Sequence, residues 1–257
     1  MSNIHPTAII HPGAQIGKDC TIGPHCVIGS QVKMGDRNEL APFVIIDGDT
    51  TIGDDNRIFS FAVLGTEPQD LKFSGEPTRL RVGSRNRIRE FVTLNTSTDM
   101  QEDTVVGDDN LLMEYVHVAH NCRVGNGCVI ANVVQLAGHV VVYDHAIIGG
   151  ATGVHQFVHI GTHSFVGGAS AIKKDIAPYT RGQGNPYRTV GLNSVGLMRK
   201  GYSSETVEAI KQIYNLFYRK GLNTTQALAA ADAIPDLVPE QRNFIEFVRN
   251  SDRGLST

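Results

Sequence analysis

The chain has 257 residues, with 23 Lys and Arg against 26 Asp and Glu, and a formal net charge of −3. Because the basic and acidic residues are nearly equal in number, the protein has no global positive field, and we expect no nucleic-acid partner. The length suits one elongated domain or two small ones, and no stretch approaches the roughly 18 apolar residues of a membrane span.

The first ten residues, MSNIHPTAII, contain neither a basic segment nor a long apolar run, so they do not resemble a signal peptide. The four cysteines stand at positions 20, 26, 122 and 128, which is not the spacing of a zinc finger. We therefore expect a cytoplasmic protein that does not insert into a membrane. We also expect no cofactor and no metal finger built on the cysteines.

An aliphatic residue recurs at every sixth position over most of the chain. The first run extends from Ile4 to Leu64, a short one from Val82 to Leu94, and a third from Val106 to Ile172. Self-similarity at a fixed period is typical of a solenoid, and a period of six predicts a parallel β-helix. Three such hexads close one triangular coil, so residues 18 apart should stack. We expect this β-helix over residues 1–177.

The same register predicts where the cysteine side chains lie. The fifth position of each hexad holds a small residue, and all four cysteines fall there. They should face the narrow interior of the coil, whereas a reactive thiol needs exposure and an electropositive setting. Packing is therefore the favoured interpretation of the cysteines.

Two segments interrupt the register without destroying it. Residues 66–81, TEPQDLKFSGEPTRLR, are polar and rich in turn formers, and residues 95–105 form a second polar stretch. We expect both to be loops inserted at a corner of the coil. Insertions of this kind are commonly found on a working face.

Four histidines gather on one side of the predicted prism. Stacking by 18 places His120, His139 and His155 around one corner of three successive coils, with Gln156 beside them and His117 on the adjoining face. Three interpretations are open: a ladder of polar turn residues, a zinc site such as β-helical carbonic anhydrases have, or a general base with its substrate ligands.

Beyond Ile172 the hexads stop and a helical period takes over. Apolar residues recur at helical spacing from about residue 204 to 220, with Ser203 or Ser204 as a cap. A short helix should follow Thr224, and Pro239 suits the first turn of a third. We expect a small helical domain over residues 178–257. Residues 170–220 also carry nine basic against three acidic side chains, which suits an anionic ligand or partner.

Several motifs in this order resemble the UDP-N-acetylglucosamine acyltransferases of lipid A synthesis. The motifs are IHPTAII, PQDLKFSGEPT, RNRIRE, HVAHNC, LAGHV, GVHQF, QGNP and SDRGL, and the resemblance spans nearly the whole chain. It implies a left-handed β-helix, a homotrimer with sites between subunits, and transfer of a 3-hydroxyacyl chain from acyl carrier protein to the 3-hydroxyl of the sugar nucleotide. The basic segment would attract the acidic carrier protein.

The resemblance also implies roles for individual residues. His120 would be the general base, and the backbone N–H of Gly138 would stabilise the oxyanion. Asn121 stands where relatives often have Asp, and an amide can orient an imidazole without contributing charge. Val195 likewise replaces a carboxylate of some relatives near the nucleotide.

The remaining residues would hold the substrates. Gly168 would be the floor of the acyl groove. The other implied ligands are Asp70, Lys72, His117, His139 and His155 for the sugar or acyl chain, and Gln156, Asn193 and Arg199 for the nucleotide and its diphosphate.

Other functions stay open at this point. The acceptor could be the 3-amino analogue of the sugar, or the chain could be a different hexapeptide-repeat acyltransferase or a carbonic anhydrase-like protein. A catalytically inactive β-helical scaffold is the non-enzyme alternative.

Overall fold

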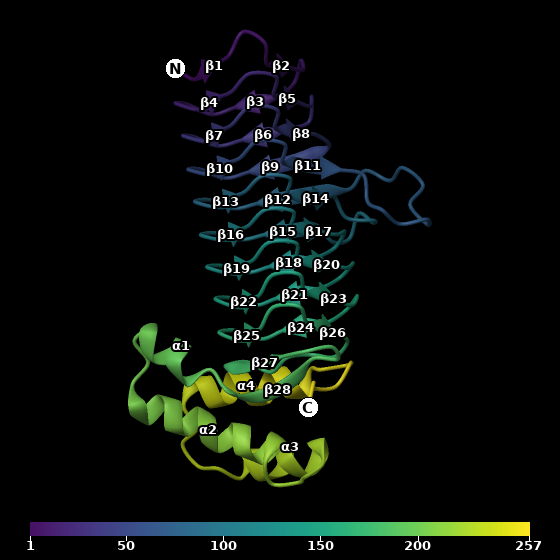
Figure 1. The fold of residues 1–257 in the computed structure, drawn as a ribbon. Coiled ribbons are helices and arrows are strands. Elements are labelled where there is room, and N and C mark those ends of the chain that lie inside the picture. The colour runs from purple at the N-terminus through teal and green to yellow at the C-terminus, as the bar shows by residue number, and fades with distance from the viewer.

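The computed structural model describes all 257 residues and shows a tall prism of stacked coils that ends in helices (Figure 1). Each coil contributes one short strand to each of three parallel sheets, which we name sheet A, sheet B and sheet C. The chain passes from A to B to C and back to A, so the prism has an A–B corner, a B–C corner and a C–A corner.

The strands of each sheet run in order along the prism. Sheet A contains β1 (Asn3–Ile4), β4 (Thr21–Ile22), β7 (Glu39–Leu40), β10 (Arg57–Ile58), β13 (Arg87–Ile88), β16 (Leu111–Leu112), β19 (Val129–Ile130), β22 (Ile147–Ile148), β25 (Phe165–Val166), β27 (Thr180–Gln183) and β28 (Arg188–Leu192). Sheet B contains β2 (Ile9–Ile10), β5 (Val27–Ile28), β8 (Ile45–Ile46), β11 (Val63–Thr66), β14 (Thr93–Asn95), β17 (His117–Val118), β20 (Gln135–Leu136), β23 (Gly153–Val154) and β26 (Ala171–Ile172). Sheet C contains β3 (Gln15–Ile16), β6 (Lys33–Met34), β9 (Asp49–Ile52), β12 (Arg79–Val82), β15 (Thr104–Val106), β18 (Arg123–Val124), β21 (Val141–Val142) and β24 (His159–Ile160).

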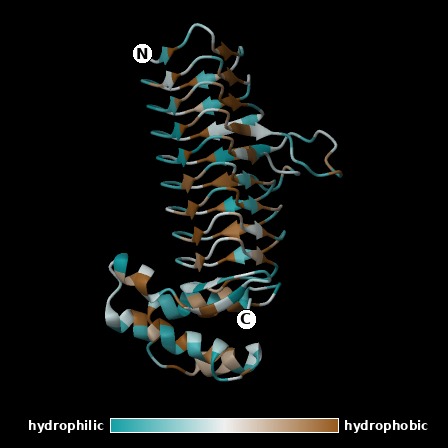
Figure 2. Ribbon diagram, viewed as in Figure 1, coloured by the Kyte–Doolittle hydropathy of each residue, from teal (hydrophilic) through white to brown (hydrophobic).

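The repeat of six residues forms the core. Val118 pairs with Leu136 and Leu136 with Val154, which confirms the predicted stacking at an interval of 18. The aliphatic residue of nearly every hexad is buried in one cluster of 40 residues, and hydrophobic residues recur in the strands of successive coils (Figure 2). All four cysteines are buried, free and part of this cluster, as the register predicts.

One residue of almost every turn adopts a left-handed backbone conformation. At the A–B corner these residues form an exposed aromatic ladder, in which Phe43, Phe61, Phe91 and Tyr115 stack at centroid distances of 4.8–5.2 Å. At the C–A corner Arg37 pairs with Asp55, in one of several charged pairs along that edge. The A–B and C–A corners therefore present different chemistry.

Both predicted insertions leave from the B–C corner. The first occupies residues 67–78 between β11 and β12 and projects far from the prism (Figure 1), and the second occupies residues 96–103 between β14 and β15. Strand β12 begins at Arg79, earlier than the predicted end of the first loop, and Arg79 pairs with Asp103 at 2.6 Å.

The C-terminal part starts as a continuation of sheet A. Strands β27 and β28 form an antiparallel hairpin that pairs with β25, and four helices follow. These are α1 (Ser194–Arg199), α2 (Ser204–Tyr218), α3 (Thr224–Asp232) and α4 (Pro239–Arg249). The hairpin and α1 were not predicted, because neither shows a period of six or a long helical pattern.

The three longer helices agree with the sequence pattern. The Ser203 side chain accepts the N–H of Thr206 at the start of α2, and Pro239 occupies the first turn of α4. The helices share their own core of 11 buried residues, which includes Phe244 and Ile245. None of the helices combines the length and apolar character that crossing a bilayer would require.

Candidate active site

The B–C corner brings together histidine and glutamine side chains and both insertions. His120, His139 and Gln156 follow strands β17, β20 and β23 at this corner, one coil apart, and both insertions emerge from the same corner on the preceding coils. The period of six therefore brings residues that are 18 apart in sequence onto one edge.

His120 is nearly enclosed, with 13% of its side chain exposed. Its Nδ1 lies 3.0 Å from Oδ1 of Asn121, a residue that is 2% exposed. The Asn121 Oδ1 also accepts hydrogen bonds from the backbone N–H and the hydroxyl of Thr98, at 3.0 and 2.9 Å. The Asn121 amide nitrogen donates to Oδ2 of Asp99 at 3.2 Å.

These contacts fix the roles of the two imidazole nitrogens. A backbone N–H can only donate, so the atom of Asn121 that faces Thr98 must be its oxygen. The same oxygen faces Nδ1 of His120, so Nδ1 carries the proton and donates. The lone pair of the neutral ring is then on Nε2, which points away from Asn121.

The first insertion places a carboxylate beside that nitrogen. Oδ2 of Asp70 lies 3.9 Å from Nε2 of His120, and the Asp70 side chain is 30% exposed. The backbone N–H of Lys72 donates to Asp70 Oδ1 at 2.9 Å, whereas the Lys72 side chain is exposed and has no partner in the chain. The gap of 3.9 Å exceeds a direct hydrogen bond.

Gly138 lies directly over the imidazole of His120, one coil further on. A Cβ on Gly138 would lie 2.5 Å from Nε2 of His120, so only glycine fits without displacing the ring. The carbonyl of Gly138 accepts the N–H of Phe157 at 3.2 Å, but its own N–H donates to no group of the chain. A free backbone donor beside a proton acceptor is suited to stabilising a developing oxyanion.

Two more histidines surround His120. The ring of His139 packs edge-on against His120 with centroids 5.2 Å apart and stacks on Phe157 at 4.5 Å. Burial lowers the pKa of His139, and so does the neighbouring His120. His117 bonds to the hydroxyl of Thr93 at 2.7 Å, and its pKa is also lowered, by burial and then by His120.

A shallow, apolar depression of about 420 Å³ opens on sheet B next to this corner. Its floor includes Gly153, which has no side chain, and Ala171, which has only a methyl group, so the outer face of the sheet is bare there. Its rim includes His117, His155 and Lys173. His155 is exposed, with Nδ1 3.0 Å from the carbonyl of Gln156.

Three of the predicted ligands lie elsewhere. Asn193 and Arg199 line a pocket of about 540 Å³ against sheet A, together with Lys200 and the stacked rings of His145 and His163. The Asn193 amide donates to the carbonyl of His163 at 3.0 Å.

The third, Gly168, sits at the A–B corner after β25 and is exposed. A single chain therefore brings together the histidine group and Asp70, but it does not join them to Asn193 and Arg199. Burial lowers the pKa of His163 to about 4, with further contributions from His145 and Lys200.

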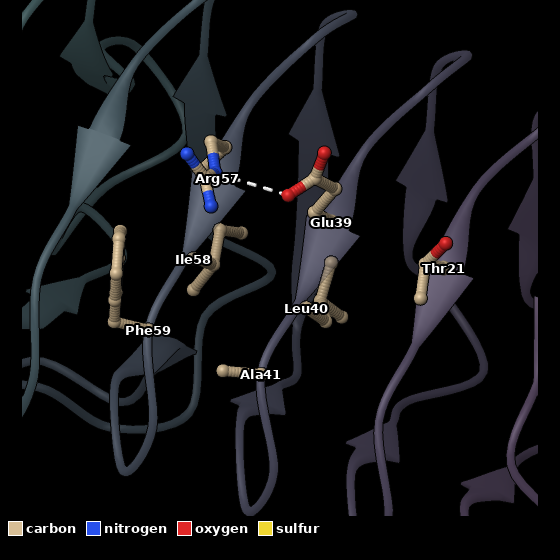
Figure 3. Close-up of a pocket in the computed structure, with 7 residues that line it drawn as sticks. All are labelled: Thr21, Glu39, Leu40, Ala41, Arg57, Ile58 and Phe59. Atoms are coloured by element: carbon tan, nitrogen blue, oxygen red, sulfur yellow. Dashed lines mark ion pairs between the residues drawn. The ribbon is translucent and has the colours of Figure 1, made fainter.

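Another pocket, of about 190 Å³, lies on sheet A of the early coils (Figure 3). Arg57 and Glu39 pair across it at 3.0 Å, and the guanidinium of Arg57 also lies 5.7 Å from the ring of Phe59. Its charged groups are already paired with each other, and no histidine lines it, so it adds nothing to the site.

The zinc interpretation would need a set of converging ligands. No group of three or more His, Cys, Asp or Glu side chains is arranged to hold a metal ion.

Sequence reasoning did not find Thr98 and Asp99. Both lie in the second insertion, within the stretch NTSTD, and both hold the side chain of Asn121. Only the polar character of the insertion pointed towards them, since their distance in sequence from Asn121 follows no period.

Comparisons with known proteins give consistent results. A family model described as UDP-N-acetylglucosamine O-acyltransferase, domain 2, matches residues 175–256, and the bacterial transferase hexapeptide model matches residues 1–35 and 103–138. The acyl-[acyl-carrier-protein]–UDP-N-acetylglucosamine O-acyltransferase of Verminephrobacter eiseniae is 48% identical over 250 residues, which cover 97% of this chain and 95% of that protein.

Solved structures agree along the whole chain. The UDP-N-acetylglucosamine acyltransferase of Bacteroides fragilis superposes with a TM-score of 0.96 at 41% identity, covering 99% of this chain and 100% of that one. The corresponding enzyme of Moraxella catarrhalis gives a TM-score of 0.95 at 43% identity, with 99% of each chain covered. These matches confirm the predicted fold class, a left-handed parallel β-helix followed by a small helical part.

Proposed function

The chain belongs to the UDP-N-acetylglucosamine O-acyltransferase family, and we propose that it transfers a 3-hydroxyacyl chain from acyl carrier protein to the 3-hydroxyl of UDP-N-acetylglucosamine, with His120 as general base. The acyl transfer is the reaction named for its relative of 48% identity, and the resemblance of the sequence motifs assigns this reaction to lipid A synthesis. The observation that carries the residue assignment is the fixed imidazole of His120 directly beneath the free N–H of Gly138.

The base works through Nε2. With Nδ1 donating to Asn121, the Nε2 lone pair takes the proton of the sugar hydroxyl as the hydroxyl oxygen attacks the thioester carbonyl. The carbon–oxygen bond forms, the carbonyl electrons move onto oxygen, and the N–H of Gly138 stabilises that charge. Collapse of the tetrahedral intermediate breaks the carbon–sulfur bond, and the imidazolium returns its proton to the leaving thiolate.

Direct transfer is preferred to a covalent acyl-enzyme. Cys122 is the cysteine closest in sequence to His120, and burial raises the pKa of its thiol to about 12, so it does not form a thiolate at neutral pH. Its side chain also faces the closed interior of the coil, where no substrate carbonyl can reach it.

The surroundings of His120 suit the two substrates. Asp70 stands near Nε2 and can orient the hydroxyls of the sugar, with Lys72 beside it on the same loop. The apolar depression between His117 and His155 suits the first methylenes of the acyl chain. Gly168 would limit the far end of the chain, and Gln156, His139 and the polar pocket around Asn193 and Arg199 would hold the rest of the sugar nucleotide.

The proposal includes a homotrimer, because a single chain holds only parts of the site. The histidines lie where sheet B meets the B–C corner, whereas Arg199 and Asn193 lie against sheet A. If sheet B of one chain faces sheet A of the next around a threefold axis, the two parts meet between subunits. The A–B corner then points to the axis, where the aromatic ladder, with Phe61 and Phe91 each more than 40% exposed, would become buried.

Product analysis tests the proposed function. The purified protein is incubated with a mixture of 3-hydroxyacyl carrier proteins and either UDP-N-acetylglucosamine or its 3-amino analogue, and the nucleotide products are identified by mass spectrometry. We expect the 3-O-acylated sugar and one preferred chain length. Acylation of the amino analogue alone would change the acceptor, and no acylated product with either sugar would contradict the proposal. The proposed cytoplasmic location is tested by fractionation of cells.

A further inference from the structure

The second insertion has a specific connection to the base. It contributes two residues to the region beneath His120, and both contact the side chain of Asn121 rather than the substrate side of the corner. Asn121 is buried, and its backbone N–H is held by the hydroxyl of Thr104 at 2.8 Å. The backbone is thus anchored independently, and Thr98 and Asp99 are the groups other than His120 that hold the amide in its orientation.

We propose that Asp99 is a positioning residue for the acyl transfer, acting through Asn121 to keep the proton of His120 on Nδ1. The inference rests on the proposed function, because it concerns the tautomer of the proposed base. The chain of contacts runs from the Asp99 carboxylate to the Asn121 amide nitrogen, and from the Asn121 oxygen to Nδ1 of His120, at 3.2 and 3.0 Å.

The orientation of this amide decides whether His120 can act. If the amide rotated by half a turn, its NH₂ group would face Nδ1 of His120, and Nδ1 would have to accept. The proton would then sit on Nε2, which could no longer take a proton from the sugar. Asp99 disfavours that state because its Oδ2 accepts from no group of the chain other than the NH₂ group of Asn121.

Asp99 is itself held firmly and stays charged. Its Oδ1 accepts the backbone N–H groups of Gln101 and Glu102 at 2.8 and 3.0 Å, which leaves Oδ2 for Asn121. The hydrogen bond from the Glu102 N–H is the largest influence that lowers the pKa of Asp99. A carboxylate one amide away from His120 also favours the imidazolium that forms during transfer, since hydrogen-bonded groups polarise one another.

The first experiment is Asp99→Asn, assayed for kcat and KM at several pH values. This change puts an NH₂ group opposite the NH₂ group of Asn121, so we expect kcat to fall by about 10- to 100-fold, as when an outer partner of a functional histidine is lost. The KM for the sugar nucleotide should change by less than about twofold, because Asp99 faces away from the substrate. Glu102→Gln is the matched control, since it removes one charge from the same turn and keeps the backbone N–H that Asp99 accepts. Its kcat should fall far less than that of Asp99→Asn, and an equal fall in both variants would overturn the proposal.

The second experiment exchanges the two side chains. Asn121→Asp alone puts two carboxylates at the 3.2 Å contact and should lower kcat, whereas the double variant Asn121→Asp/Asp99→Asn restores a donor and an acceptor there. We expect the double variant to exceed either single variant in kcat. The acid limb of its kcat against pH should also shift. Other groups near the base act on the same limb, namely the carboxylates of Asp70 and Glu102 and the imidazoles of His117 and His139.

The tautomer is tested directly on the unchanged protein. Nitrogen-15 NMR of the His120 ring at pH 8 should show the proton on Nδ1, and a proton on Nε2 would overturn the proposal whatever the variants do. Additive losses in the double variant, or normal kcat in folded Asp99→Asn, would also overturn it. If His120→Ala retained normal turnover, the proposed function would fail instead, which separates the two outcomes.

Discussion

Replacing Gly138 by alanine would place a methyl group against the imidazole of His120. The added Cβ would start 2.5 Å from Nε2, whereas ordinary contact begins at 3.4 Å, so the ring and the backbone must separate by about 1 Å. Neither gives way easily, because Asn121 holds the ring and the Gly138 carbonyl bonds to the N–H of Phe157. A displacement of about 1 Å in reacting groups lowers turnover by about 10²-fold, or about 2.7 kcal/mol.

The assay is kcat for acyl transfer, with folding checked by thermal unfolding. We expect Gly138→Ala to lose about 10²-fold in kcat and to remain folded, since a methyl group forced into a packed site lowers the stability by about 1–3 kcal/mol. Gly191→Ala is the control, because its new methyl group would meet only one side chain, at 3.7 Å. Turnover near that of the unchanged protein in a folded Gly138→Ala variant would refute the proposed catalytic role of Gly138 beside His120.

Three further results are expected. Gly168→Met should shift acyl preference towards chains shorter by several methylenes, since each displaced methylene forgoes about 0.8 kcal/mol of burial; an unchanged product profile would remove Gly168 from the groove. Mixing inactive His120→Ala chains with weakened Arg199→Ala chains during assembly should restore activity, because some sites would then combine an intact His120 with an intact Arg199. No recovery would indicate that each chain forms a whole active site by itself. His163 has a folded pKa of about 4 against 6.5 unfolded, so the unfolded chain takes up its proton first and stability should fall as pH drops from about 6.5 to 4. His163→Phe should flatten that dependence, measured as thermal midpoints, and an identical slope would contradict it.

The period of six allowed the coil to be predicted in detail. A hexad specifies one strand, one turn and one inward side chain, so the pairing of Val118 with Leu136 and the burial of Cys122 follow from position alone. Helix α2 was equally predictable from the sequence, because its cap and its apolar face are local features. The β27–β28 hairpin could not be predicted, because its strands pair with each other and with β25 of the last coil, and no local pattern specifies that pairing.

The site was predictable only as far as the period reaches. Stacking by 18 placed Gly138 above His120, and the structure has that arrangement. The contribution of Asp99 depends on how a polar insertion folds back under the corner, which no periodicity determines. The position of Arg199 against sheet A follows from the hairpin and from α1, so its separation from His120 within one chain could not be predicted either.

The most direct test of the account compares the unchanged protein with His120→Ala. Turnover with acyl carrier protein and UDP-N-acetylglucosamine, and binding of the sugar nucleotide by calorimetry, are measured on both. Removing a positioned general base should lower kcat by about 10²–10⁴-fold, while the dissociation constant of the sugar nucleotide changes little, because the pocket around Asn193 and Arg199 lies on another face. A folded His120→Ala variant with near-normal turnover would contradict the assignment of His120 as the base.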